Sequence, residues 1–84
     1  MRYKIKKGLI IEKVNKKTVI FDTNNSTLNS FNKTASEIFE MLRKNLTEEE
    51  IINKIANKYS IKKERAEKDL KNLILDLKKK KILF

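Results

Sequence analysis

The sequence contains no cysteine, no histidine, no proline and no tryptophan, and its one glycine is Gly8. Without cysteine and histidine the chain has no disulfide, no thiolate or imidazole metal ligand, and neither the serine-histidine-aspartate triad nor the cysteine nucleophile of common hydrolases. One glycine is too few for a glycine-rich phosphate loop, in which several glycines let the backbone approach the ligand closely. These absences exclude most common enzyme chemistries and the usual nucleotide-binding loops.

Long apolar runs and paired catalytic groups are also missing. No run is long enough to span a bilayer, and residues 8–11 are shorter than the apolar region of a signal peptide. The carboxylates Glu12 and Asp22 stand on predicted strands without an evident partner acid or base. We therefore expect a cytoplasmic protein with no membrane contact, no cofactor and no catalytic activity of its own.

The length and the apolar pattern indicate one small folded domain. Eighty-four residues, of which 39% are hydrophobic, suffice for a single domain over residues 1–84 with a small core. The apolar residues are clustered with clear periodicities, which distinguishes the chain from a disordered polycation.

The first part of the chain has the pattern of strands. Three short runs rich in β-branched or apolar residues, Leu9–Val14, Thr18–Asp22 and Thr27–Phe31, are separated by polar turns at residues 15–17 and 23–26. Asparagine in the turns tolerates left-handed backbone angles. The pattern predicts an antiparallel meander whose third strand is an edge with one thinly covered face.

The apolar period changes to that of helices after the third strand. Apolar residues recur at spacings of three and four between Ala35 and Leu42, with Asn32 or Thr34 as the N-cap. Glu37 follows Thr34 by three residues, which predicts a capping box.

Two further helices follow. The second is expected to begin after Thr47, with Glu50 completing a capping box. The third is expected to begin near Ser60 or Lys62 and to end around Lys80, with one apolar stripe along its length.

The apolar residues 82–84 should pack under the sheet or the helix bundle. Three strands followed by three helices predict an α+β fold, an N-terminal three-stranded antiparallel β-meander with winged-helix-like architecture.

The order of these elements and several short matches resemble the PqqD family. This family comprises small peptide chaperones of pyrroloquinoline quinone biosynthesis and recognition elements of ribosomal peptide modification pathways. The resemblance covers roughly residues 8–84, including the second helix start at Thr47 and the last segment. Phe31 stands where leucine is commoner in the family, and the chain is more basic than many members. The pairs that match in order and spacing are Phe31-Asn32, Thr34-Ala35 and Ile38-Phe39.

The resemblance implies a peptide-binding protein of natural product biosynthesis. Such a RiPP recognition element binds the leader segment of a ribosomally made precursor peptide and presents it to a separate modifying enzyme, such as a radical SAM enzyme, a leader protease or a cyclase. The leader is added as an antiparallel strand to the third strand, with side chains in a groove beside the third helix. By position, the implied peptide-binding residues are Ser26, Thr27, Leu28, Asn29, Ser30, Phe31, Lys62, Lys63, Ala66, Glu67 and Leu70.

These residues are expected to contribute in different ways. Leu28 and Phe31 would supply apolar contacts, and Ala66 would leave room for a ligand side chain. The pattern alone leaves open whether Phe31, Ala66 and Leu70 belong to the groove or to the core. Each exposed ion pair with an acidic leader would contribute about 0.2–1 kcal/mol. The basic residues expected to make such pairs are Lys62, Lys63 and Arg65.

Two other functions compete with peptide capture. The formal net charge is +10, and a basic third helix in a winged-helix-like chain could lie in the major groove of DNA. Against DNA binding, the basic residues are spread over the whole chain and the strands precede the helices, so we rank it second. Pairing of two third strands would instead make a dimer. We therefore expect a monomer or a weak dimer.

Overall fold

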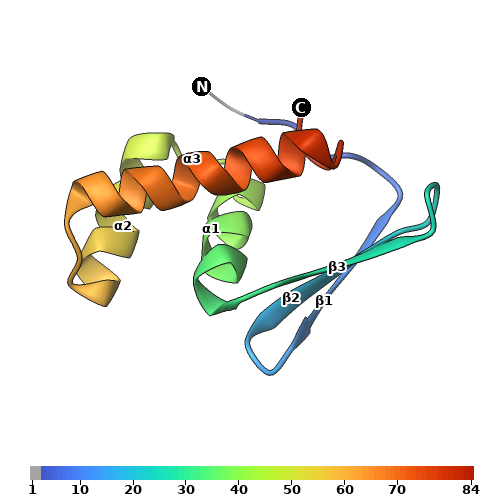
Figure 1. Ribbon diagram of the computed structural model, residues 1–84, viewed down its shortest axis with the longest axis horizontal. Helices are drawn as coiled ribbons and strands as arrows, with labels where there is room; N and C mark the ends of the chain where they lie inside the picture. Colours follow the sequence, from blue (N-terminus) through green and yellow to red (C-terminus); the bar gives the residue numbers. More distant parts are fainter. Residues whose placement is uncertain (1–2) are drawn as a thin grey trace.

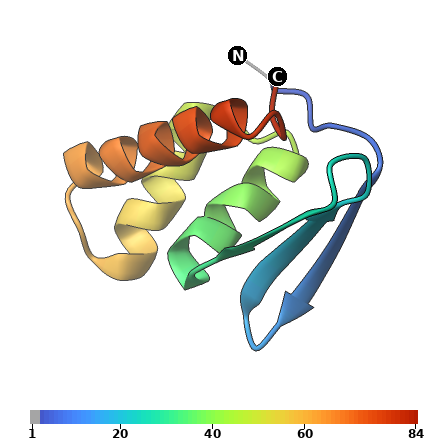
Figure 2. The ribbon, with the colours of Figure 1, turned by 45° about the vertical axis from the view of Figure 1, so that its right-hand side comes forward.

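The computed structural model describes residues 3–84 and confirms three strands followed by three helices. The sheet has the order β1-β2-β3 and is antiparallel throughout. The helices lie to one side of the sheet, and the other face of the sheet carries no helix (Figures 1 and 2). The elements are β1 (Leu9–Val14), β2 (Lys17–Asp22), β3 (Thr27–Phe31), α1 (Lys33–Arg43), α2 (Glu48–Tyr59) and α3 (Lys63–Lys79).

A two-residue turn joins β1 to β2. Asn15 and Lys16 both have left-handed backbone angles, with φ of 52° and 67°. This is the signature of the tight turn that matches the twist of a hairpin, and it pairs Val14 directly with Lys17. Strand β2 therefore begins at Lys17, one residue earlier than the sequence pattern predicts.

Aromatic and aliphatic side chains pack between the sheet and the helices. Ile20 of β2 and Phe31 of β3 are buried against Ile38 and Phe39 of α1. The Phe31 and Phe39 ring centroids are 5.8 Å apart with planes inclined by 46°, an arrangement that favours aromatic pairs. Phe31 is thus a core residue at the end of the edge strand.

Helix α1 is capped by Asn32, whose side chain accepts a hydrogen bond of 2.8 Å from a backbone N–H three residues later. The predicted capping box of Thr34 and Glu37 is wrong. The Glu37 carboxylate instead accepts hydrogen bonds from Lys58 Nζ at 2.6 Å and from the Tyr59 hydroxyl at 2.8 Å. Burial opposes ionisation of Glu37, but these two donors outweigh it and lower its pKa.

The predicted capping box of α2 is confirmed. Thr47 Oγ1 accepts a bond of 3.1 Å from the Glu50 backbone N–H, and the Glu50 carboxylate accepts one of 2.9 Å from the Thr47 backbone N–H. The latter bond is the main reason that the pKa of Glu50 is lowered. The helix ends at Tyr59, and the C-cap residue Ser60 has the left-handed conformation with φ of 52°. Helix α3 then takes Lys62 as its N-cap.

The segment that precedes β1 lies beside the last residues of the chain (Figures 1 and 2). The backbones of Lys4 and Phe84 exchange hydrogen bonds of 3.0 and 2.8 Å, and Lys6 N donates to the Ile82 carbonyl at 2.8 Å. Ile82 and Leu83 are buried as the tail pattern predicts, whereas the side chain of Phe84 is exposed although its backbone is paired. The sequence pattern does not predict the pairing itself. Among the described residues, no helix is long and apolar enough to cross a membrane.

Candidate functional site

Strand β3 is an edge of the sheet. It pairs with β2, and no strand of residues 3–84 pairs with its other side. Main-chain groups alternate in direction along a strand. Lys17 closes the tight turn with Val14, so its N–H and C=O face β1 and those of Thr18 face β3. On β3, the groups that face away from the sheet are consequently those of Leu28 and Ser30.

The Ser36 hydroxyl fixes the end of this edge strand to α1. It accepts a bond of 2.7 Å from the Thr18 N–H and donates one of 3.2 Å to the Phe31 carbonyl. Thr18 and Phe31 are directly paired in the sheet, so the hydroxyl is inserted into their ladder bond. This bridge shows independently that Phe31 directs its carbonyl toward β2.

A hollow of about 540 Å³ lies beside the end of β3, between that strand, α1 and α3. Its apolar lining includes the buried side chains of Phe31, Ile38 and Leu73. The remaining lining is largely polar. All the residues around the hollow are Ser30, Phe31, Asn32, Thr34, Ala35, Ile38, Arg65, Asp69, Asn72, Leu73 and Asp76.

The charged side chains of the hollow come from one flank of α3. Asp76 Oδ2 lies 3.0 Å from Lys80 Nζ, and that ammonium is also 5.9 Å from the centre of the Phe31 ring. Arg65 and Asp69 make no ion pair with any residue of the described range 3–84. The hollow thus presents one cation and one anion to a ligand, one helical turn apart.

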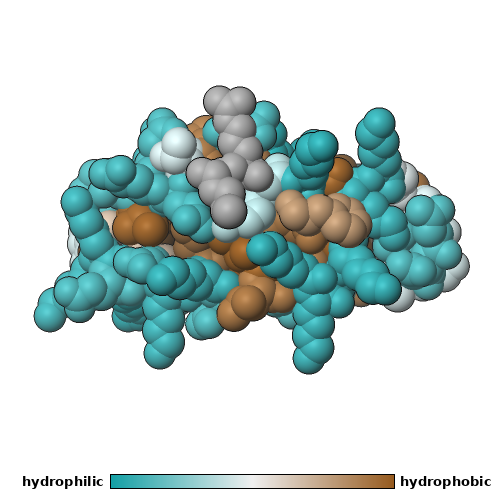
Figure 3. All heavy atoms as spheres, turned by 90° about the horizontal axis from the view of Figure 1, so that it is seen from above, coloured by the Kyte–Doolittle hydropathy of each residue, from teal (hydrophilic) through white to brown (hydrophobic). Residues whose placement is uncertain are grey.

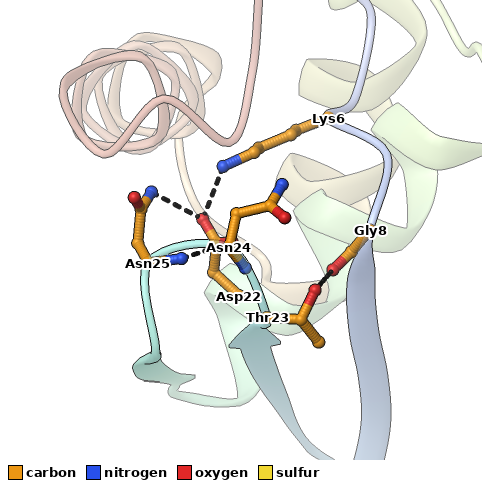
Figure 4. Close-up of polar contacts among 6 residues, drawn as sticks. All are labelled: Lys6, Gly8, Asp22, Thr23, Asn24 and Asn25. Atoms are coloured by element: carbon orange, nitrogen blue, oxygen red, sulfur yellow. Dashed lines mark hydrogen bonds and ion pairs between the residues drawn. The ribbon is translucent and has the colours of Figure 1, made fainter.

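The turn that leads into β3 is held by the buried carboxylate of Asp22 (Figure 4). Lys6 Nζ donates to Oδ2 at 2.8 Å, and the backbone N–H groups of Asn24 and Asn25 donate to Oδ1 at 3.0 and 3.3 Å. Asn25 Nδ2 adds a bond of 3.1 Å. The bond from Lys6 is the largest cause, and burial opposes it only in part, so the pKa of Asp22 is lowered.

The same turn makes use of the one glycine. The Thr23 hydroxyl donates to the Gly8 carbonyl at 2.8 Å (Figure 4). Gly8 has φ of 84°, which other residues rarely adopt. The glycine thus lets the N-terminal segment pass from its pairing with residues 82–84 into β1.

The strand residues implied by the family resemblance lie along this edge with one exception. Thr27, Leu28, Asn29 and Ser30 belong to β3, whereas Ser26 lies in the preceding turn with φ of 53°. Of the implied strand residues, Ser30 and Phe31 line the hollow.

The helix residues implied by the resemblance do not line the hollow. Ala66 and Leu70 are buried in the core, while Lys63 and Glu67 are exposed elsewhere on α3 and Lys62 is its exposed N-cap. Glu67 forms an ion pair of 2.7 Å with Lys71. Other residues, which the sequence analysis does not predict as site residues, line the hollow in their place. The sequence feature that points to those on α3 is their helical spacing next to the apolar stripe. From α3 these are Asp69, Asn72, Leu73 and Asp76, and from α1 and its N-cap they are Asn32, Thr34, Ala35 and Ile38.

A three-stranded sheet whose edge strand β3 lies next to a hollow under the last helix defines a class of small domain suited to accepting an added strand. The sequence matches the family described as Coenzyme PQQ synthesis protein D (PqqD) over residues 17–83, and the chain belongs to this family. No curated protein sequence matches it.

Two solved structures share the fold. One is described as TbiB1 in complex with the TbiA(beta) leader peptide. It is 23% identical, has a TM-score of 0.88, and the match covers 99% of this chain and 94% of that one. The other is described as lasso peptide synthetase B1 complexed with the leader peptide. It is 17% identical, has a TM-score of 0.93, and the match covers 100% and 99%.

Proposed function

We propose that this chain captures the leader segment of a ribosomally made precursor peptide as an added strand on β3 and presents it to a separate modifying enzyme. The free edge of β3, with the main-chain groups of Leu28 and Ser30 directed outward beside the hollow, carries the proposal. Membership of the PqqD family and the leader peptides named for both similar structures support it.

Strand addition explains how the edge and the hollow act together. The N–H and C=O groups of Leu28 and Ser30 would bond to the peptide backbone and supply affinity without regard to side chains. Residues of the peptide opposite Asn29 and Phe31 point to the same face as those two side chains, which is the face of the hollow. The apolar lining of the hollow then selects among peptides.

The charged side chains of the hollow align the bound peptide and contribute only a small part of the affinity. Of the three basic residues expected to meet an acidic leader, only Arg65 lines the hollow. Lys62 and Lys63 contribute instead to the long-range field of a chain with a net charge of +10. A carboxylate of the peptide near Arg65 and a cation near Asp69 is the arrangement that the hollow favours.

The proposal assigns binding to this chain and the chemistry to its partner. The modifying enzyme belongs to a class such as the radical SAM enzymes, leader proteases or cyclases, and the encounter takes place in the cytoplasm, where the precursor is made. The chain acts as a monomer or a weak dimer, since an edge occupied by the peptide is closed to a second copy.

Ser30→Pro tests strand addition directly. Proline removes the outward N–H of residue 30 and is tolerated on an edge strand when that N–H faces solvent. The probes are fluorescein-labelled peptides that tile the short reading frames next to the gene. We expect at least one of them to bind the native chain and to lose about tenfold or more in affinity with Ser30→Pro, because a main-chain bond is lost and the proline ring obstructs the incoming strand.

Ser30→Val is the matched control, because it alters the side chain and retains the N–H group. It should bind the same peptide within a factor of about three, since one exposed side chain changes stability or binding little. Far-ultraviolet circular dichroism should be alike for the native chain and both variants. Equal binding by the proline and valine variants would overturn strand addition on β3.

A further inference from the structure

The outer face of the sheet carries a single apolar row that crosses all three strands. Ile10 pairs with Phe21, and Phe21 pairs with Leu28. These side chains point away from the helices and are 50%, 36% and 69% exposed. The neighbouring row, Glu12 to Val19 to Ser30, is polar at both ends. Phe21 is shielded from both sides, whereas Leu28 has a neighbour on one side only.

An added strand would complete this row. In an antiparallel pair, residues directly opposite each other point to the same face of the sheet. Because the main-chain groups of Leu28 face outward, the peptide residue opposite it would exchange both hydrogen bonds with Leu28. Its side chain would then lie against the exposed flank of Leu28, on the face opposite the hollow.

We infer that Leu28 is a specificity-determining residue, which selects an apolar or β-branched side chain at the peptide position opposite it, as the fourth member of the row Ile10–Phe21–Leu28. This inference rests on the proposed function and adds a second surface of the protein that selects among peptide side chains. The hollow contacts the peptide residues opposite Asn29 and Phe31, and the outer row contacts the peptide residue opposite Leu28. In an antiparallel peptide the outer position lies three residues C-terminal to the one opposite Phe31.

The other end of the row does not offer an equivalent site. Ile10 directs its main-chain groups toward Phe21, because Val14 and Lys17 close the turn and the alternation continues along β1. A strand added to β1 would therefore bond to residues whose side chains are not in the row. The hollow also lies beside β3 and not beside β1.

The test begins with a surface-displayed library of random short peptides sorted for binding to the native chain. In the enriched peptides, the residues that face the hollow should be two positions apart. The same peptides should share an apolar or β-branched residue at the position three residues C-terminal to the one opposite Phe31. In a double-mutant cycle, Leu28→Thr and a serine at that peptide position should each weaken binding. Their coupling should be about two- to fivefold in Kd, the size of a cross-strand pair.

Val14→Thr is the matched control. Val14 is exposed on the same face but lies on β1, and its pairing partner Lys17 is not in the row. It should show no coupling with any peptide position. One outcome is that peptides bind the native chain and bind Ser30→Pro more weakly, while Leu28→Thr shows no coupling with any peptide position. That result would contradict the selection by Leu28 and would leave strand capture on β3 in place. If no peptide is enriched, both the inference and the proposed function are overturned.

Discussion

At the scale of single residues, Asp22 connects the position of β3 to the rest of the molecule. Its carboxylate accepts bonds from the turn that precedes β3 and from Lys6, which lies on the N-terminal segment paired with residues 82–84. The aspartate is buried although the chain offers many exposed positions for acids. Burial alone disfavours an ionised carboxylate, so the bonds from Lys6 and the turn are what keep Asp22 ionised.

The lowered pKa of Asp22 predicts a loss of stability in acid. The unfolded chain binds a proton near pH 4, whereas the folded chain resists protonation, so the free energy of unfolding rises with pH in that range. The contribution of Asp22 is therefore complete above about pH 4 and is lost as the pH falls through the folded pKa. Thermal unfolding between neutral pH and pH 2 should show Asp22→Asn less stable than the native chain at neutral pH, with the difference shrinking in acid.

Lys6→Gln removes the largest cause of the shift in the pKa of Asp22. It should flatten the same part of the pH curve while retaining the bonds from the turn. If Asp22→Asn loses as much stability in acid as the native chain, the carboxylate does not hold the turn in its ionised form.

At the scale of elements, α3 has two flanks with different surroundings. Arg65, Asp69, Asn72 and Asp76 recur along the flank that lines the hollow. The opposite flank carries Lys71 and other exposed residues, and it lies away from β3. Only the first flank can contact a peptide on the edge of β3.

Asn72→Trp should fill the hollow and exclude the peptide. Asn72 is exposed and lines the hollow, so the indole enters the hollow without displacing a core residue. We expect peptide affinity to fall by about tenfold or more, because the pocket for the buried anchor is lost, with little change in the melting temperature. Lys71→Trp places the same indole on the other flank and should leave peptide affinity within a factor of about two. Similar losses for the two variants would contradict a site in the hollow.

The sequence pattern predicts the elements well and the lining of the hollow only in part. Alternation and turn residues place the strands, and helical spacing with the Thr47 capping box places the helices. An apolar stripe shows which face of α3 is apolar, but it leaves open whether Ala66 and Leu70 belong to the groove or to the core, and the structure places both in the core. The pattern does not show which flank of that stripe meets the sheet, because this depends on how α3 packs across α1. The positions of Asp69 and Asn72 beside the hollow therefore cannot be predicted from the stripe alone.

Some local alternatives also need the tertiary structure for their resolution. Glu37 has the spacing of a capping residue, yet Lys58 and Tyr59 of α2 offer its carboxylate better partners. The pairing of Lys4 with Phe84 joins the two ends of the chain and has no local sequence signal. Contacts of this kind are decided by packing between distant segments.

At the scale of the whole molecule, the charge of +10 is distributed rather than gathered into one site. Hydrophilic side chains project around the face seen in Figure 3, while apolar atoms lie in its middle. Every element except β3 carries lysine, for example Lys13 on β1 and Lys54 on α2. The flank of α3 beside the hollow has acids as well as bases. DNA binding instead relies on several cations that contact phosphates together.

Salt dependence separates the two functions by a wide margin. A protein that makes six or more phosphate contacts loses about a thousandfold or more in DNA affinity between 50 and 200 mM salt. Strand addition relies on main-chain bonds and apolar contacts, and an ion pair at Arg65 adds only about 0.2–1 kcal/mol. Peptide Kd should therefore change by less than about tenfold over the same range. Titrations of the peptide and of a duplex oligonucleotide at both salt concentrations measure this, with Arg65→Gln expected to reduce the small peptide effect further. A peptide affinity that collapses with salt as steeply as duplex binding would show that charge, and not the edge of β3, holds the ligand.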